Sequence, residues 1–219
     1  MKLNVKSKYK AKELVVVYTS CLANYIPKAR VLGKSLKIFH PDWKFILILG
    51  EPWPIEEPRR NNDPFDAIIY YDELGIPELK QWIFKHNIME VCTAVKGFSA
   101  CYLFEKLKAN KVIYLDPDIQ VFSSLEEVNN LLDTYDILLI PHHLKPQPSH
   151  MIETNELSQM RNGIFNLGFI AFADREEGIS CARWWKDRLH NFCYIDVLRG
   201  LFTDQRWCDF IHHFLINIT

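Results

Sequence analysis

Residues 111–122 read Lys-Val-Ile-Tyr-Leu-Asp-Pro-Asp-Ile-Gln-Val-Phe. The apolar run 112–115 has the length and composition of a buried parallel strand. Two carboxylates, Asp116 and Asp118, follow it at once, and a second apolar stretch at 119–122 reads as another strand. In an open α/β sheet, ligands bind at the edge formed by the carboxyl ends of the strands. This stretch therefore predicts an α/β fold with two aspartates at its ligand-binding edge.

The spacing of Asp116 and Asp118 has two interpretations. In an extended segment, residues i and i+2 point to the same side, so one hard divalent cation could bind both carboxylates and keep positions open for phosphate oxygens. Asp-Pro-Asp is also ordinary turn chemistry, because proline fixes φ and aspartate supports turns. The position directly after a buried strand favours the first interpretation, a metal–diphosphate site.

Composition limits the class of protein. The chain has 219 residues, enough for one substantial α/β domain, with 48% hydrophobic and 24% charged residues. A net charge of −1 gives no reason to expect a nucleic acid partner. The six cysteines form no C-x-x-C pair, which fits reduced thiols in a cytosolic protein.

The two ends of the sequence differ in character. The first twelve residues contain five lysines but no apolar core of a secretory signal. They predict a solvated tail in a cytoplasmic protein, with weak attraction to the inner face of an anionic membrane as the alternative. Residues 214–219 are apolar almost to the last residue, whereas chain ends are usually polar, so we expect a chain cut within a longer protein.

Hydrophobic periodicity predicts alternating strands and helices along the chain. We expect strands or extended segments at 14–19, 44–49, 67–71, 137–140, 163–173 and 214–218. We expect helices at 26–39, 78–108 (in two pieces interrupted near Asn87), 125–132, 176–192 and 204–213, with a long irregular segment at 141–163. Such alternation predicts a largely parallel sheet in a single α/β layer architecture.

Four segments, in this order, resemble a known family. They are 15–19 leading to Asn24-Tyr25, then 93–96 (Thr-Ala-Val-Lys), then 112–118, and finally 165–169 (Phe-Asn-Leu-Gly-Phe) with 203–205 (Thr-Asp-Gln). Together they resemble the nucleotide-sugar glycosyltransferases of the GT-A type, close to family 8 with its glycogenin-like and bacterial galactosyltransferase-like members. The resemblance extends from residue 14 to about residue 213.

This resemblance implies a fold and an activity. It implies one Rossmann-like GT-A catalytic domain over residues 1–219, with a mostly parallel mixed sheet flanked by helices. Such enzymes transfer a sugar from a nucleotide diphosphate donor to a glycan or lipid-linked acceptor. They use Mn²⁺ or Mg²⁺, usually with retention of the anomeric configuration. Polysaccharide or glycoconjugate synthesis is the setting that the family suggests.

The resemblance also implies roles for residues near the donor. Asp116 and Asp118 would hold the metal that bridges the diphosphate. Tyr18, Thr19, Asn24 and Tyr25 would touch the base or ribose, and Lys96 would face the diphosphate and the catalytic carboxylate. The alternatives are a core or boundary position for the tyrosines and an ordinary surface lysine.

Four further residues match motifs around the donor sugar. Asn166 and Gly168 would lie beneath the sugar, although a glycine in a strand also marks a bulge. The resemblance implies that Asp204 orients sugar hydroxyls and that Gln205 stabilises an oxocarbenium-like centre. Thr203 or Asp204 is also a suitable N-cap for the last helix, and we expect capping and substrate contact together.

One departure from the family keeps other functions open. Family 8 members supply a histidine as third metal ligand beyond the Asp-Gln helix, and no matching motif appears before residue 219. Either the ligand lies in a continuation or the two aspartates act without it. The alternatives are a non-catalytic nucleotide-sugar-binding domain and, less favoured by the motif's mid-chain position, a haloacid-dehalogenase-like phosphatase.

Overall fold

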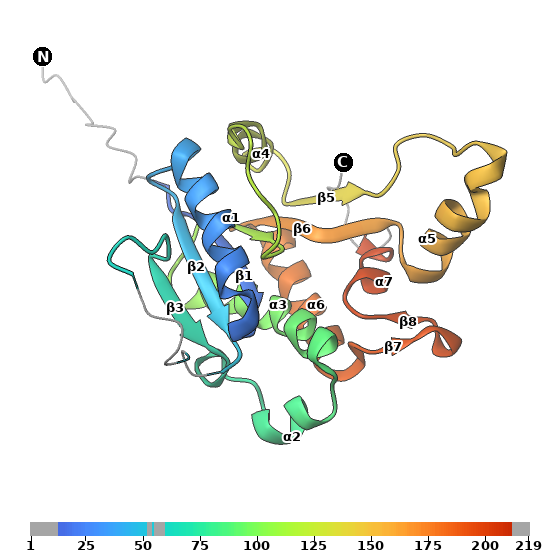
Figure 1. Cartoon of the computed structure of the whole chain (residues 1–219), viewed down its shortest axis with the longest axis horizontal. Helices are drawn as coiled ribbons and strands as arrows, with labels where there is room; N and C mark the ends of the chain where they lie inside the picture. The colour runs from blue at the N-terminus through green and yellow to red at the C-terminus, as the bar shows by residue number, and fades with distance from the viewer. Residues whose placement is uncertain (1–12, 52–53, 55–59, 212–219) are drawn as a thin grey trace, which may run out of the picture.

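The computed structural model describes residues 13–51, 54 and 60–211. At its centre is a six-stranded sheet in the order β3-β2-β1-β4-β6-β5 (Figure 1). The strands are β1 (Val15–Cys21), β2 (Lys44–Leu49), β3 (Ala67–Tyr70), β4 (Lys111–Leu115), β5 (Ile137–Pro141) and β6 (Phe165–Ala173). Neighbouring strands from β3 to β4 are parallel, whereas β6 is antiparallel to both β4 and β5. The predicted mostly parallel mixed sheet is therefore confirmed.

Helices cover both faces of this sheet because side chains alternate along each strand. Tyr18 of β1 packs in a buried cluster with residues of α3 and α6, whereas Val17 packs in a cluster with residues of α1. A Cβ at Gly97 would come within 2.6 Å of Lys186 Cα, so the close approach of α3 and α6 depends on this glycine. The helices are α1 (Ile26–Phe39), α2 (Leu79–Phe84), α3 (Ile88–Glu105), α4 (Glu126–Leu131), α5 (Leu157–Asn162), α6 (Glu176–Phe192) and α7 (Gln205–Cys208).

A capping box at Asn87 begins α3 and separates it from α2. The predicted interruption near Asn87 is therefore confirmed. Asn87 Oδ1 accepts from the backbone N–H of Glu90, and the Glu90 carboxylate accepts from the backbone N–H of Asn87, both at 2.9 Å. Glu90 also accepts from Ile195 N–H at 2.8 Å. This contact joins α3 to a hairpin of β7 (Ile195–Asp196) and β8 (Leu201–Phe202). The hairpin was not predicted from the sequence, because two-residue strands are too short to show alternation.

Two predicted segments differ in the structure. Residues 119–122 form no strand, because the Val121 N–H donates to Ser35 Oγ of α1 at 2.9 Å and its side chain packs in the α1 cluster. The predicted irregular segment 141–163 contains a 3₁₀ turn at Ser149–Met151, a π-helical turn at Ile152–Glu156 and α5. These turns are too short for a visible helical period.

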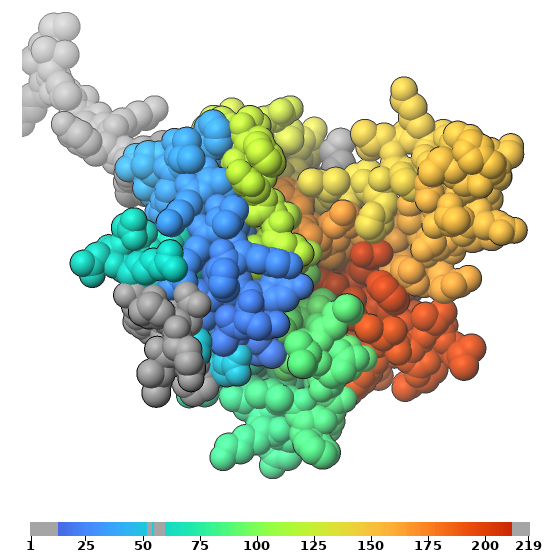
Figure 2. Space-filling model, viewed as in Figure 1, coloured from blue at the N-terminus to red at the C-terminus, as the bar shows by residue number. Residues whose placement is uncertain are grey.

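The segment from β5 to β6 protrudes beside the β5 edge of the sheet, on the right in Figures 1 and 2. At the other end of the chain, α7 is shorter than the helix predicted at 204–213. The strand predicted at 214–218 lies outside the described residues.

Candidate active site

A cavity of about 580 Å³ opens at the edge of the sheet where β1 and β4 end and β6 begins. Its walls come from the residues after β1, the first half of α3, the end of β4, the start of β6 and the segment 203–205. Because β6 runs antiparallel to β4, Phe169 of β6 pairs with Leu115 of β4. The antiparallel pairing therefore places the start of β6 beside the residues that follow β4.

Most of the site residues predicted from the sequence line this one cavity. They are Asn24, Tyr25, Lys96, Asp116, Asp118, Asn166, Gly168, Asp204 and Gln205. Cys92 and Met89 of α3 and Ser20 of β1 also line it, and the sequence analysis did not single them out. The binding of a nucleotide-sugar donor by these residues stays a prediction.

Tyr18 and Thr19 do not line the cavity, and both are fully buried. The Tyr18 hydroxyl donates to the backbone oxygen of Lys96 at 2.9 Å, and Thr19 points to the opposite face of the sheet. The prediction that these side chains touch a base or ribose therefore disagrees with the structure. The reason is that β1 continues to Cys21, two residues beyond the predicted strand end, and keeps both side chains inside the fold.

Asp116 is the first residue after β4, and its backbone is fixed on both sides. Its N–H donates to the Gly168 oxygen at 2.9 Å. The Ile119 N–H donates to the Asp116 oxygen at 3.1 Å, which closes a turn with Pro117 in its second position. The turn interpretation of Asp-Pro-Asp is therefore correct for the backbone, and the extended geometry expected for 116–118 is wrong. The turn leaves the Asp116 side chain 40% exposed at the cavity.

Lys96 and Asp204 form a buried ion pair in the cavity wall. Lys96 Nζ lies 2.9 Å from Asp204 Oδ2, 3.0 Å from the Leu167 oxygen and 3.5 Å from Asp116 Oδ1. Burial alone would lower the pKa of Lys96, but the carboxylates of Asp204 and Asp116 outweigh it and hold that pKa above its ordinary value. Lys96 is therefore an ammonium at neutral pH that links two carboxylates.

Asp204 occupies the N-cap position of α7 but makes no side-chain capping hydrogen bond. Its Oδ2 accepts from Lys96, and its Oδ1 accepts from the Thr203 hydroxyl at 3.2 Å. Burial raises the pKa of Asp204, against the opposing effect of Lys96. The predicted capping role of Asp204 is therefore wrong, and its carboxylate is turned to Lys96 and Thr203 instead of to the first N–H groups of α7.

The start of β6 and the start of α7 complete the wall. Asn166 Oδ1 accepts from the Gly168 N–H at 2.9 Å. The Gln205 amide nitrogen donates to the backbone oxygens of Asn162 and Gly163, both at 3.1 Å. Since the donor end of this amide is held by the backbone, its oxygen is the end that Gln205 can offer to a ligand.

Asp116 and Asp118 are the candidate metal ligands, and both supply the oxygen donors that hard divalent cations prefer. A Cβ at residue 168 would lie 3.0 Å from Asp116 Oδ2, so Gly168 leaves space beside that oxygen. Asp118 is exposed, with Lys28 Nζ 3.9 Å from its Oδ2. The donor chemistry and the space at Gly168 fit Mn²⁺ or Mg²⁺. Within the described ranges, no group of three or more His, Cys, Asp or Glu residues gathers around a common point.

Tyr114 is a site residue that the sequence analysis missed. Its hydroxyl donates to Asp116 Oδ1 at 2.7 Å, and Lys96 Nζ lies 4.3 Å from the centroid of its ring. Burial and the negative charge of Asp116 raise the pKa of Tyr114, so the hydroxyl stays protonated. The signal was available, because residues i and i+2 of a strand share a side and Tyr114 precedes Asp116 by two.

No known protein-family profile matches the sequence. The uncharacterized protein YfnF of Bacillus subtilis (strain 168) is 27% identical over 137 residues, which cover 59% of this chain and 43% of YfnF. The chain therefore spans less than half the length of this curated relative.

The likeness to solved structures is greater in fold than in sequence. The galactosyltransferase LgtC, in complex with donor and acceptor sugar analogues, matches with a TM-score of 0.50 and 18% identity, over 86% of this chain and 71% of LgtC. This chain has the GT-A fold. The glycosyltransferase GlyE of Streptococcus pneumoniae TIGR4 matches with a TM-score of 0.49 and 16% identity, over 88% of this chain and 44% of GlyE. The match to LgtC confirms the fold that the motif resemblance predicted.

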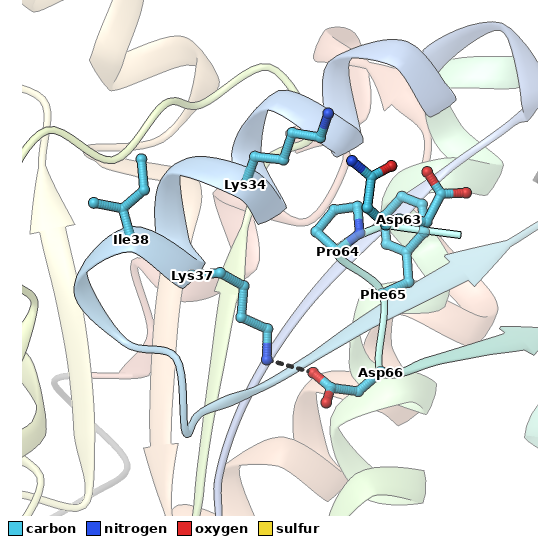
Figure 3. A pocket seen from close by; sticks show the side chains of 8 residues that line it. Lys34, Lys37, Ile38, Asp63, Pro64, Phe65 and Asp66 are labelled. Atoms are coloured by element: carbon cyan, nitrogen blue, oxygen red, sulfur yellow. Dashed lines mark hydrogen bonds and ion pairs between the residues drawn. The ribbon is translucent and has the colours of Figure 1, made fainter. Parts of the chain in front are cut away.

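A second cavity of this GT-A fold, of about 590 Å³, lies beside the start of β3 (Figure 3). Three of the charged residues at its wall have partners: Lys37 Nζ lies 2.6 Å from Asp66 Oδ2, and Asp63 Oδ1 lies 2.7 Å from Arg30 Nε. None of the predicted site residues line it, so the cavity at Asp116 is the candidate active site. Among the described helices, none has both the length and the apolar character that crossing a membrane requires.

Proposed function

We propose that residues 1–219 form the catalytic domain of a glycosyltransferase that moves a sugar from a nucleoside diphosphate to a glycan or lipid-linked acceptor. The observation that carries this proposal is the arrangement of Asp116 in one cavity with the Lys96–Asp204 pair. Sugar transfer requires a site for a diphosphate with its cation and, beside it, polar groups for a sugar. The GT-A fold and the order of the four sequence segments support the same function.

Asn24 and Tyr25 are the proposed contacts for the nucleoside. Tyr25 is half-buried at the cavity, with Lys28 Nζ 4.1 Å from the centroid of its ring, and Asn24 beside it is exposed. An aromatic face offers a stacking surface for a base, and a side-chain amide offers both a donor and an acceptor.

Asp116 and Asp118 are the proposed ligands of Mn²⁺ or Mg²⁺, which diphosphate oxygens would share. When bound, the cation supplies Lewis-acid stabilisation of the charge on the departing nucleoside diphosphate. Lys28 adds a positive charge at the same edge, 3.9 Å from Asp118. Lys96 is less suited to direct contact with the diphosphate than the sequence suggests, because its side chain is only 6% exposed.

Asp204 and Gln205 are the proposed groups facing the reacting sugar. The Asp204 side chain is 4% exposed and both its oxygens have partners, which argues against an attacking nucleophile and favours orientation of sugar hydroxyls. The Gln205 amide oxygen is suited to stabilising positive charge at the anomeric carbon.

These roles favour retention by displacement on one face of the sugar. The bond from the anomeric carbon to the diphosphate oxygen breaks, and the bond to the acceptor oxygen forms on the same face. The acceptor proton passes to the departing phosphate oxygen. A route through a covalent Asp204 intermediate would need that carboxylate to leave Lys96.

Thermal-shift measurements with UDP, GDP, ADP and CDP, each with and without Mn²⁺, test this function. A ligand that binds only the native state raises the unfolding midpoint by mass action. We expect one nucleotide to raise it in a Mn²⁺-dependent way in the wild type but not in Asp116→Asn/Asp118→Asn. If no nucleotide shifts the midpoint of this chain, the donor site is wrong.

A product assay separates the alternative functions. The matching nucleotide sugar should release nucleoside diphosphate, slowly together with free sugar when water is the acceptor, and faster together with a glycosylated product when a sugar acceptor is present. Free phosphate would instead indicate a phosphatase. Binding of the nucleotide without any turnover would favour a non-catalytic nucleotide-sugar-binding domain.

A further inference from the structure

The two carboxylate oxygens of Asp116 have different surroundings. Oδ1 accepts from the Tyr114 hydroxyl at 2.7 Å and lies 3.5 Å from Lys96 Nζ. Oδ2 lies beside Gly168, where a Cβ would come within 3.0 Å, and no donor in the described part of the chain hydrogen-bonds to it. One oxygen is therefore held by the protein, and the other is turned toward the space that glycine keeps open.

Tyr114 can hold Oδ1 because its own position is fixed. The residue lies in β4 between two neighbouring strands, and only 1% of it is exposed. Its ring meets the edge of the Tyr18 ring at a centroid distance of 5.1 Å, and Lys96 Nζ covers it at 4.3 Å. A ring packed in this way has no alternative rotamer available without moving its neighbours.

We propose that Tyr114 is a positioning residue that holds Asp116 Oδ1 and thereby presents Oδ2 to the divalent cation. This inference rests on the metal-dependent donor site proposed above. Without the hydroxyl, Lys96 is the remaining attraction on the carboxylate, because its ammonium is already 3.5 Å from Oδ1. The carboxylate would then rotate toward Lys96, and Oδ2 would no longer point to the proposed cation position.

The test compares three variants in direct Mn²⁺ titrations, in which electron paramagnetic resonance measures the free Mn²⁺ with and without UDP, GDP, ADP or CDP. Tyr114→Phe removes only the hydroxyl. Tyr18→Phe is the matched control, because it also removes a buried tyrosine hydroxyl but one that donates to a backbone oxygen. A third variant carries 4-aminophenylalanine at position 114, which restores a donor at the end of the ring.

We expect Tyr114→Phe to weaken Mn²⁺ binding about tenfold, as is typical when the partner of a metal ligand is lost. Tyr18→Phe should bind Mn²⁺ within about twofold of the wild type, and 4-aminophenylalanine should recover most of the loss. Circular dichroism shows whether Tyr114→Phe folds. If it does not, the Mn²⁺ affinity of the 4-aminophenylalanine variant tests the proposal instead. Wild-type affinity in that variant supports the proposal, and tenfold weaker binding overturns it.

Three other results would overturn the inference, two by excluding the hydroxyl and one by removing the metal site. Wild-type Mn²⁺ affinity in Tyr114→Phe, or equal losses in Tyr114→Phe and Tyr18→Phe, would exclude a specific role for this hydroxyl while the metal site itself stands. A wild-type chain that binds no Mn²⁺ with any of the four nucleotides would remove the metal site, and with it the positioning role.

Discussion

Lys96 Nζ and Asp204 Oδ2 lie 2.9 Å apart, joining residues that are 108 positions apart in the sequence. Both side chains are almost completely buried. The pair connects the middle of α3 to the start of α7, and Lys96 also reaches toward Asp116 at the end of β4. One ammonium therefore links three separate segments of the candidate active site.

Removing this ammonium should destabilise the whole fold. Lys96→Met leaves the Asp204 carboxylate buried without its counter-charge, so we expect the free energy of unfolding to fall by about 3–5 kcal/mol. Urea unfolding followed by circular dichroism measures it. The double variant Lys96→Met/Asp204→Leu removes the stranded charge and should recover part of the loss. A single variant as stable as the wild type would mean that the pair is open to water.

The same pair should affect stability at alkaline pH. The pKa of Lys96 is higher in the folded chain than in the unfolded chain, so its contribution is fully present below about pH 10.4, the ordinary lysine value, and is lost as the pH rises through the folded value. Between pH 9 and 11.5, we expect wild-type stability to fall more steeply than that of Lys96→Met/Asp204→Leu. Tyrosines and cysteines away from the pair titrate alike in both proteins, so the difference reports Lys96 with its carboxylate partners and the buried groups beside it, such as Tyr18 and Cys193. Parallel pH profiles would contradict it.

Gly168→Ala should weaken the metal site without weakening the fold. The added Cβ would lie 3.0 Å from both Asp116 Oδ2 and Asn166 Oδ1, so these oxygens must move by a few tenths of an ångström. We expect Mn²⁺ affinity to fall about tenfold, while the free energy of unfolding changes by less than about 1.5 kcal/mol. Combining Gly168→Ala with Asn166→Ala relieves one of the two contacts and should restore part of the affinity. Unchanged Mn²⁺ binding in Gly168→Ala would show that Oδ2 is not a ligand.

Gly97→Ala should have the opposite profile, with a large effect on stability. Its Cβ would meet the Lys186 backbone at 2.6 Å, and a backbone cannot turn aside as a side-chain end can. We expect α3 and α6 to separate slightly, at a cost of about 1–3 kcal/mol. The effect should exceed that of Gly168→Ala in the same urea experiment, and the reverse order would contradict this packing.

The sequence was most informative where an element is long enough to repeat its pattern. The helices at 26–39 and 176–192 and the strand at 44–49 were predicted with the bounds that the structure has. The hairpin β7–β8 and the short helix α5 were not predicted, because neither is long enough to repeat its hydrophobic pattern twice. The direction of β6 could not be predicted either, because the alternation of apolar residues is the same in a parallel and an antiparallel strand.

The candidate site residues also differ in how far the sequence could predict them. Asp116 was singled out by its position directly after a buried strand, whereas Asn166 and Asp204 were named from the motifs that resemble family 8 glycosyltransferases. All three line the cavity, and their roles stay predictions. Tyr18 and Thr19 were assigned wrongly by an error of two residues in the end of β1. The partners of Lys96 could not be predicted in detail, since one of them is a backbone oxygen, that of Leu167.

Because β6 pairs antiparallel with β4, the contact between their ends at the cavity does not depend on how many residues lie between the two strands. Asp116 and Gly168 are held together by pairing of β4 with β6, whatever the intervening residues do. The part of the protruding segment that precedes Asn162 can therefore be lengthened, shortened or exchanged while the strand register is kept, whereas the backbone at Asn162 and Gly163 must stay because it holds the Gln205 amide. Such a protein could change the molecule that it binds beside the segment between β5 and β6 and still keep Asp116 next to Gly168.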